Sequence, residues 1–173
     1  NGLETTLGSV AIQAGSGGIH LLETDGLTVD SVTFSVEQVE DDGTSSTETP
    51  PALSDLKTST NGSIILKTAG AGNLVLNNGA DADGLAISAN GSGSIRLEVS
   101  AGSLDINSDV VSGTGHITLL ASTNVDLGSA VDVSTSTGGD ISIEATAGTL
   151  NMDGTATVKA TDSGLRLFAN GNI

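Results

Sequence analysis

Gly139-Asp140-Ile141-Ser142-Ile143 decides the fold of this chain, together with its near copy Gly148-Thr149-Leu150-Asn151-Met152. Each stretch is a glycine, one spacer residue, and two large apolar residues separated by a polar one. This alternation has a period of two residues, which is typical of a short β-strand with one buried face. The full unit starts at nine glycines, namely Gly8, Gly17, Gly62, Gly72, Gly93, Gly102, Gly115, Gly139 and Gly148. The repeat therefore predicts an all-β protein made of many short strands.

The spacing of the units predicts how these strands stack. Grouped in threes, the first strands are expected near Val10, Val32, Ile64, Ile95, Ile117, Ile141 and Leu165. The second strands are expected at Leu104, Val125, Leu150 and Ile173, and the third strands at Val110, Val131 and Ala156. The three series agree on a coil of about 22–24 residues, which indicates a parallel β-solenoid with three short strands per coil. A right-handed solenoid is expected, because parallel crossovers are overwhelmingly right-handed.

Other repeat architectures fit the spacing less well. A hairpin meander would also contain short alternating strands, but it does not require a three-strand period. A left-handed hexapeptide helix would have coils of about 18 residues, and a calcium-binding nonapeptide solenoid needs a Gly-Gly-x-Gly-x-Asp series that is absent here.

Two steps are longer than the others, which predicts two inserted loops. The first insertion is placed within residues 37–60, which carry both prolines and a run of acidic residues. Proline cannot donate to a central strand ladder, so this part is expected to protrude as a loop or to be a partly disordered linker. The second insertion is placed at residues 77–84. Because the chain stops in mid-repeat at Ile173, residues 1–173 are expected to be a single solenoid segment of a longer repeat protein.

Composition limits the classes of partner. The net charge is −16, from 21 acidic against five basic residues, which disfavours nucleic acid and anionic membrane surfaces. There is no cysteine, so disulfides and thiolate metal sites are excluded. No run of about 18 apolar residues is present, so no membrane span is expected. The only aromatic residues are Phe34 and Phe168, which suits a narrow core of Val, Ile and Leu.

Stacking places equivalent residues of successive coils about 4.8 Å apart, so outward side chains form rows. One such row is expected to contain His20, Val75, Asp105, Asp126, Asn151 and Asn172. Asp105 and Asp126 would be adjacent like charges, which either splay apart in solvent or share a Ca²⁺ ion.

Asp81 and Asp83 are the other candidate metal ligands. The run Asp81-Ala82-Asp83-Gly84 has the spacing of an oxygen-rich calcium loop, but it lacks the later ligands of an EF-hand. An ordinary polar turn is the alternative. Apart from Ca²⁺ at these two places, no cofactor is expected.

No catalytic arrangement stands out among the remaining polar residues. Arg96 and Arg166 should lie three coils apart on the first strands, too far for one guanidinium pair to act on a ligand. Lys67 and Glu98 should be neighbours on adjacent coils and form a surface ion pair. His20 and His116 are isolated in sequence, and no Ser-His-Asp, Cys-His or His-rich arrangement can be assembled. We therefore do not expect an enzyme.

The repeats resemble those of filamentous-haemagglutinin-type exoproteins and of other very large bacterial surface proteins. The residues that carry the resemblance are the run from Gly139 to Met152 and the run Gly115-His116-Ile117-Thr118-Leu119-Leu120-Ala121-Ser122. The resemblance covers residues 62–173 well and residues 1–36 more loosely. It implies a right-handed β-helical shaft, exported to the cell surface or medium, that serves adhesion or cell–cell contact.

These observations favour a structural shaft or spacer within an adhesin-like surface protein. Its expected partners are neighbouring repeats of the same longer chain, other copies through end-to-end or lateral self-association, and a cell-surface or glycan ligand. A β-helical carbohydrate-active enzyme of the polysaccharide lyase or hydrolase type is the alternative, and a cleft lined by three acids from neighbouring coils would favour it. A calcium-dependent self-associating filament module is a further alternative.

Overall fold

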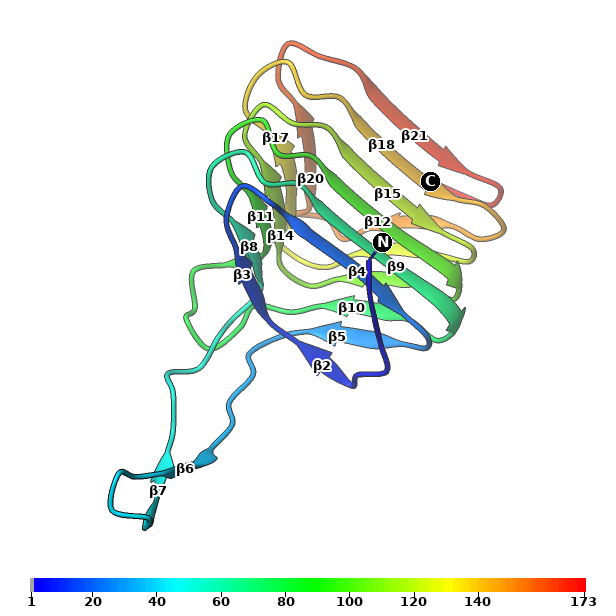
Figure 1. Ribbon diagram of the computed structural model, residues 1–173. Helices are drawn as coiled ribbons and strands as arrows, with labels where there is room; N and C mark the ends of the chain where they lie inside the picture. The colour runs from blue at the N-terminus through cyan, green and yellow to red at the C-terminus, as the bar shows by residue number, and fades with distance from the viewer. Residues whose placement is uncertain (1) are drawn as a thin grey trace.

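The computed structural model describes residues 2–173 and confirms the predicted fold class, a parallel β-solenoid with three short strands per coil. Figure 1 shows the coils stacked in chain order, from the N-terminal coil in blue to the C-terminal coil in red. The first strands recur at Ile95, Ile117, Ile141 and Leu165, so the regular coils have the predicted length of 22 to 24 residues. No helix in residues 2–173 is long and apolar enough to cross a lipid bilayer.

Each side of the coil forms one sheet, in which every strand pairs in parallel with its counterparts one coil away. The first sheet contains β1 (Leu3–Thr5), β4 (Ile19–Glu23), β9 (Ile64–Ala71), β12 (Ile95–Ala101), β15 (Ile117–Ala121), β18 (Ile141–Ala145) and β21 (Leu165–Ala169). The second contains β2 (Ser9–Val10), β5 (Leu27–Val29), β10 (Leu74–Leu76), β13 (Leu104–Ile106), β16 (Val125–Leu127) and β19 (Leu150–Met152). The third contains β3 (Ile12–Ala14), β8 (Leu56–Thr58), β11 (Leu85–Ala89), β14 (Asp109–Ser112), β17 (Asp132–Thr135) and β20 (Thr157–Ala160).

The core is a set of apolar rows that run along the solenoid. In the first sheet, Ile64, Ile95, Ile117 and Ile141 occupy equivalent positions, and all four are buried. The other two sheets contribute matching rows of Leu, Ile and Val, so each coil buries its apolar face against the coils on either side. Burial of one such side chain is worth about 1.5–3 kcal/mol, and the short strands depend on this stacking for their stability.

The glycine of the repeat stands where the backbone of the neighbouring coil leaves no room for a side chain. A Cβ atom at Gly139 would lie 2.2 Å from the carbonyl oxygen of Gly115. A Cβ atom at Gly93 would likewise lie 2.1 Å from the carbonyl oxygen of Gly62. Real side chains do not tolerate such distances, so the glycine lets successive coils approach at this corner.

Two long excursions leave the solenoid at the same corner, between the second and third sheets, in consecutive coils. Residues 30–55, which we call the arm, connect β5 to β8, and residues 77–84 connect β10 to β11. The arm contains an antiparallel hairpin of β6 (Val36–Val39) and β7 (Ser45–Glu48). Figure 1 shows the arm extending beyond the N-terminal coil, away from the C-terminal one.

The boundaries of the first insertion differ from those predicted. The chain leaves the solenoid at residue 30 rather than 37, and residues 56–58 belong to the third sheet as β8. The hairpin also gives this segment a defined secondary structure, unlike a disordered linker. The prediction failed here because the alternation Leu56-Lys57-Thr58 is short and follows a polar, proline-containing stretch.

Two of the predicted first strands were wrong. Val10 lies on β2 in the second sheet, and Val32 lies in the arm, where it bridges to Leu53. The first-sheet strands of these coils are β1 and β4 instead. All three sides of a coil share the same apolar alternation, so only spacing can tell them apart. That spacing is irregular in the first two coils, because Leu3 pairs with Leu21 and Ile19 with Ile64.

The third-sheet register and the ends of the outward row also differ from the prediction. Val110 pairs with Val133 and not with Val131, a slip of two residues that keeps the same face inward. The next partner is accordingly Val158 and not Ala156. His20 lies on β4 of the first sheet, beside Ile65. Asn172 lies outside the strands, where its carbonyl oxygen accepts a hydrogen bond from the Leu150 amide.

Candidate functional site

The outer face of the second sheet carries the predicted pair of aspartates. The row there reads Ser9, Thr28, Val75, Asp105, Asp126 and Asn151. Asp105 and Asp126 are register partners on β13 and β16, so two carboxylates stand next to each other on adjacent coils.

Neighbouring amides hold both carboxylates. Asn73 Nδ2 donates to Asp105 Oδ2 at 3.0 Å, and Asn151 Nδ2 donates to Asp126 Oδ1. Burial raises the pKa of Asp105 despite the Asn73 hydrogen bond, and the negative charge of Asp126 raises it further. Asp105 therefore holds a proton more tightly than an isolated aspartate does.

These aspartates line an open groove of about 650 Å³. Its lining residues are Val75, Asp105, Asn107, Asp126, Leu127, Gly128, Asn151, Met152 and Asp153. Asp105, Asp126 and Asp153 thus reach one groove from three successive coils. The lining contains no aromatic and no basic residue, so it offers no sugar-stacking platform and no cationic partner for an acidic substrate.

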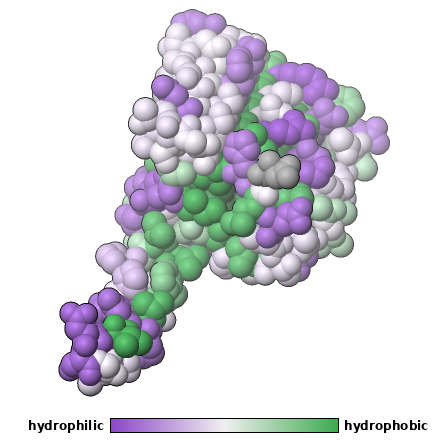
Figure 2. Space-filling model, in the orientation of Figure 1, coloured by the Kyte–Doolittle hydropathy of each residue, from purple (hydrophilic) through white to green (hydrophobic). Residues whose placement is uncertain are grey.

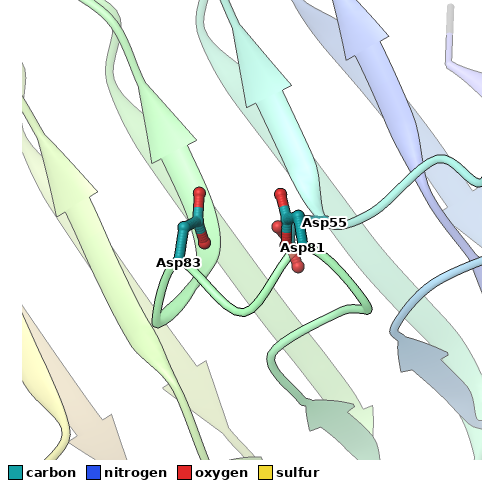
Figure 3. Close-up of side chains that lie close together, drawn as sticks. All are labelled: Asp55, Asp81 and Asp83. Carbon is teal, nitrogen blue, oxygen red and sulfur yellow. The ribbon is translucent and has the colours of Figure 1, made fainter.

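A second polar site lies where the two excursions meet the solenoid. Lys57 on β8 points its ammonium group at three carboxylates, those of Asp55, Asp81 and Asp83, and we call these four residues the Lys57 cluster. Lys57 Nζ lies 2.6 Å from Asp81 Oδ2, 2.7 Å from Asp83 Oδ2 and 3.1 Å from Asp55 Oδ2. Figure 3 shows the loop that bears Asp81 and Asp83 passing beside Asp55. The cluster therefore ties residues 77–84 to the end of the arm.

The members of the Lys57 cluster differ in their exposure to solvent. The side chain of Asp55 is fully buried, whereas those of Asp81 and Asp83 are 39% and 37% exposed. The side chain of Lys57 is 23% exposed. Asp55 Oδ1 accepts a hydrogen bond from the Gly79 amide at 3.0 Å, whereas Asp55 Oδ2 forms only the ion pair with the Lys57 ammonium at 3.1 Å.

Protonation in the cluster follows from these contacts. Burial raises the pKa of Asp55 even though the Lys57 ammonium opposes this shift. The hydrogen bond from Lys57 lowers the pKa of Asp83. Burial alone would lower the pKa of Lys57, but the three carboxylates outweigh it and leave that pKa raised. Lys57 therefore carries a positive charge at neutral pH.

The structure thus brings Asp81 and Asp83 together with two residues that the sequence analysis did not select. One oxygen from each of Asp55, Asp81 and Asp83 lies within 4.8 Å of the others, a spacing suited to a metal ion. Within residues 2–173, Asp105, Asp126 and Asp153 do not converge in this way. Asp55 and Lys57 were missed because they were assigned to the inserted loop, although Leu56-Lys57-Thr58 shows the strand alternation.

The arm presents apolar and acidic side chains to solvent. Phe34, Val36 and Val39 are exposed, and Val39 is 75% accessible. Residues 30–55 contain seven acidic residues and no basic one: Asp55 is buried, and the other six are Asp30, Glu37, Glu40, Asp41, Asp42 and Glu48. Figure 2 shows apolar surface continuing from the body of the solenoid onto the arm, whose tip is mostly hydrophilic.

The outer face of the first sheet carries surface ion pairs. The predicted pair of Lys67 and Glu98 is confirmed, with Lys67 Nζ 2.7 Å from Glu98 Oε1. Arg96 also reaches Glu98, at 2.7 Å. Arg96 and Arg166 stand three coils apart in the same row, as predicted.

The two histidines lie in different places. His20 is exposed on β4. His116 accepts a hydrogen bond at Nδ1 from the Asp140 amide, at 3.0 Å.

Comparisons of the chain with protein-family models, with curated protein sequences and with solved structures found no match.

Proposed function

We propose that this chain is a structural shaft segment of a large, exported, adhesin-like bacterial surface protein that mediates attachment or cell–cell contact. The observation that carries the proposal is the uninterrupted first sheet, in which β1, β4, β9, β12, β15, β18 and β21 form one parallel ladder. A ladder of this kind, backed by a continuous apolar core, makes a stiff spacer. The resemblance of the repeats to filamentous-haemagglutinin-type exoproteins agrees with export and adhesion.

The arm is the element that we assign to contact with a ligand. It projects from the shaft, exposes Phe34 and Val39, and is fixed at its end by the Lys57 cluster. Binding sites are commonly carried on loops that a rigid scaffold positions. We expect the ligand to be a cell-surface protein or glycan, while neighbouring repeats of the same longer chain continue the shaft.

The arm can be removed without disturbing the coil that bears it. Deletion of residues 31–53 leaves Asp30-Ser54-Asp55 between Val29 and Leu56. The corresponding connection two coils later is Asn107-Ser108-Asp109, of equal length, and it spans the same register positions. Ser54 and Ser108 are both buried, so the shortened corner has a natural template.

Fluorescent beads coated with the full chain or with the deletion variant test the assignment. Both proteins should give the same far-UV circular dichroism spectrum per ordered residue. Beads carrying the full chain should bind cultured epithelial cells or bacterial cells, and beads carrying the deletion variant should not. Absence of binding by both proteins would argue against attachment, and equal binding by both would argue against the arm.

A second candidate function is glycoside hydrolysis in the groove of the second sheet. Asp105, Asp126 and Asp153 from successive coils line this groove, which is the arrangement that would favour an enzyme. Glycoside hydrolysis needs one protonated and one ionised carboxyl, and the raised pKa of Asp105 beside Asp126 suits such a division. The acidic lining indicates a neutral or basic polysaccharide.

Release of reducing ends from a panel of neutral and basic polysaccharides tests this second function. Asp105→Asn should abolish release, and Glu98→Gln on the first sheet is a matched control that should leave it unchanged. Failure to cleave any polysaccharide, or cleavage that survives Asp105→Asn, rules out the groove as a catalytic site.

A further inference from the structure

We propose that the Lys57 cluster is a cation-exchange site, in which a calcium ion displaces the Lys57 ammonium and binds Asp55, Asp81 and Asp83. The three carboxylates already converge, with one oxygen from each within 4.8 Å of the others. Oxygen donors with this geometry are the ligands that Ca²⁺ prefers. The site lies between the end of the arm and residues 77–84, so an ion there would bridge both excursions.

A buried oxygen that receives no hydrogen bond points to the ligand. Asp55 is fully buried, and its Oδ2 atom receives no hydrogen bond. Leaving such an acceptor without a donor costs free energy, and more so for a charged group. Its cationic partner is the Lys57 ammonium, 3.1 Å away, whereas a Ca²⁺ ion would coordinate Asp55 Oδ2 directly, at about 2.3–2.6 Å. The same excursion holds a second buried acceptor without a donor, Asn78 Oδ1, in the residue before the Gly79 amide that binds Asp55 Oδ1.

The charge balance favours a divalent ion over the ammonium. Three carboxylates against one ammonium leave the cluster with two excess negative charges, whereas Ca²⁺ leaves one. A calcium ion also takes six to eight oxygen ligands, so it can use both oxygens of a carboxylate, while an ammonium donates only three hydrogen bonds.

Lys57 can leave the site without disrupting the solenoid. Its side chain is partly exposed, and it points outward from β8, so the flexible stem can carry the ammonium into solvent. Its neighbours in the outward row of the third sheet are Gln13 and Ser88, neither of which carries a charge. The exchange therefore moves one surface side chain and keeps the strand ladder intact.

The backbone places the two exposed ligands. Ala82, between Asp81 and Asp83, has a positive φ of 53°, and Gly84 has a positive φ of 84°. These two residues curl the loop so that both carboxylates face Lys57. Asp55 itself has a φ of 65°, an unusual conformation for a residue other than glycine.

Thermal unfolding of the full chain with CaCl₂ or with EDTA tests the proposal. Extracellular calcium sites commonly bind with dissociation constants of about 0.1–1 mM, so 10 mM CaCl₂ should raise the Tm of the wild type by roughly 3–8 °C. The rise should be lost in Asp81→Asn. It should remain in Asp126→Asn, a matched change of a half-buried aspartate in the groove. Lys57→Ala, which removes the competing ammonium, should bind Ca²⁺ more tightly in calorimetric titration.

Three outcomes would overturn the proposal. The first is a wild type whose Tm does not respond to calcium, even if Lys57→Ala does bind the ion. The second is a calcium response that Asp126→Asn abolishes, because the ion would then bind in the groove. The third is equal affinity for calcium in the wild type and Lys57→Ala, because the ammonium and the ion would then not compete.

Discussion

Replacing Lys57 by methionine should destabilise the solenoid far more than the same change at Lys67. Methionine keeps an unbranched stem that is one heavy atom shorter, and it removes the ammonium group with its charge and hydrogen-bond donors. At Lys57 the change leaves the buried carboxylate of Asp55 without a cation, whereas at Lys67 it leaves the partly exposed Glu98 in contact with water and Arg96. The two variants therefore compare a cluster that has one buried member with an ordinary surface ion pair.

The magnitude follows from the exposure of each carboxylate. Asp81 and Asp83 are each more than a third exposed, so their contacts with Lys57 are worth about 0–1 kcal/mol each. Leaving the buried Asp55 carboxylate unpaired costs about 1–3 kcal/mol. We expect Lys57→Met to lower the free energy of unfolding by about 2–4 kcal/mol and Lys67→Met by about 0–1 kcal/mol.

Urea unfolding in EDTA at pH 7, followed by far-UV circular dichroism, measures both variants. Circular dichroism is the suitable probe because the chain has neither tryptophan nor tyrosine. If Lys57→Met costs no more than Lys67→Met, the Lys57 cluster is an ordinary surface contact and the reasoning is refuted.

The pH dependence provides an independent check on the same variant. In the wild type, the contact with Lys57 lowers the pKa of Asp83. The stability that this contact contributes is therefore present above the unfolded pKa of about 3.9 and is lost as the pH falls. Without Lys57, the already raised pKa of Asp55 rises further. The folded chain is then favoured at low pH, where Asp55 is protonated, and it loses stability as the pH rises and Asp55 ionises. The deficit of Lys57→Met should therefore shrink between pH 7 and about pH 4.

Three further predictions concern the core, the coil corner and the groove. Leu97→Ala, in a central coil, should cost about 3–5 kcal/mol, whereas Leu167→Ala, half-buried in the last coil, should cost about 1–2 kcal/mol in the same urea assay. Gly93→Ala would place a methyl group 2.1 Å from a backbone oxygen and should cost about 1–3 kcal/mol, whereas Gly154→Ala meets nothing within 4 Å and should change stability by less than about 0.5 kcal/mol. Asp126→Asn removes a like charge beside a carboxyl whose pKa is raised, so it should stabilise the chain by about 0.2–1 kcal/mol at pH 7 and by nothing near pH 3. An equal effect within either pair of substitutions, or a stabilisation by Asp126→Asn that persists at pH 3, would contradict the corresponding argument.

The sequence predicts the coil wherever its spacing is regular. From Ile64 onward the first sheet begins at the predicted residues, and Asp105 and Asp126 are the predicted neighbours. In that part of the chain, the glycine and the two apolar residues of each unit are enough to assign a strand to its side of the coil.

The sequence alone cannot assign a strand to its side of the coil where the spacing between repeats is irregular and only the apolar–polar alternation is left. Val10 and Val133 show why, because a strand that moves to another side, or slips by two residues, still buries the same kind of side chain. The Lys57 cluster could not be predicted from the sequence for a related reason. It depends on Lys57 returning to the third sheet after the arm, and on Asp81 arriving from the next coil.

The corner between the second and third sheets has a consequence for how such a protein diversifies. Its connections range from one residue, between Val10 and Ile12, to the whole of the arm, while the paired strands on either side keep their register. A genetic insertion at this corner therefore lengthens a surface feature without moving any core residue. New surface epitopes can arise there independently in each coil, and foreign sequences grafted between Ile106 and Val110 should be displayed without refitting the scaffold.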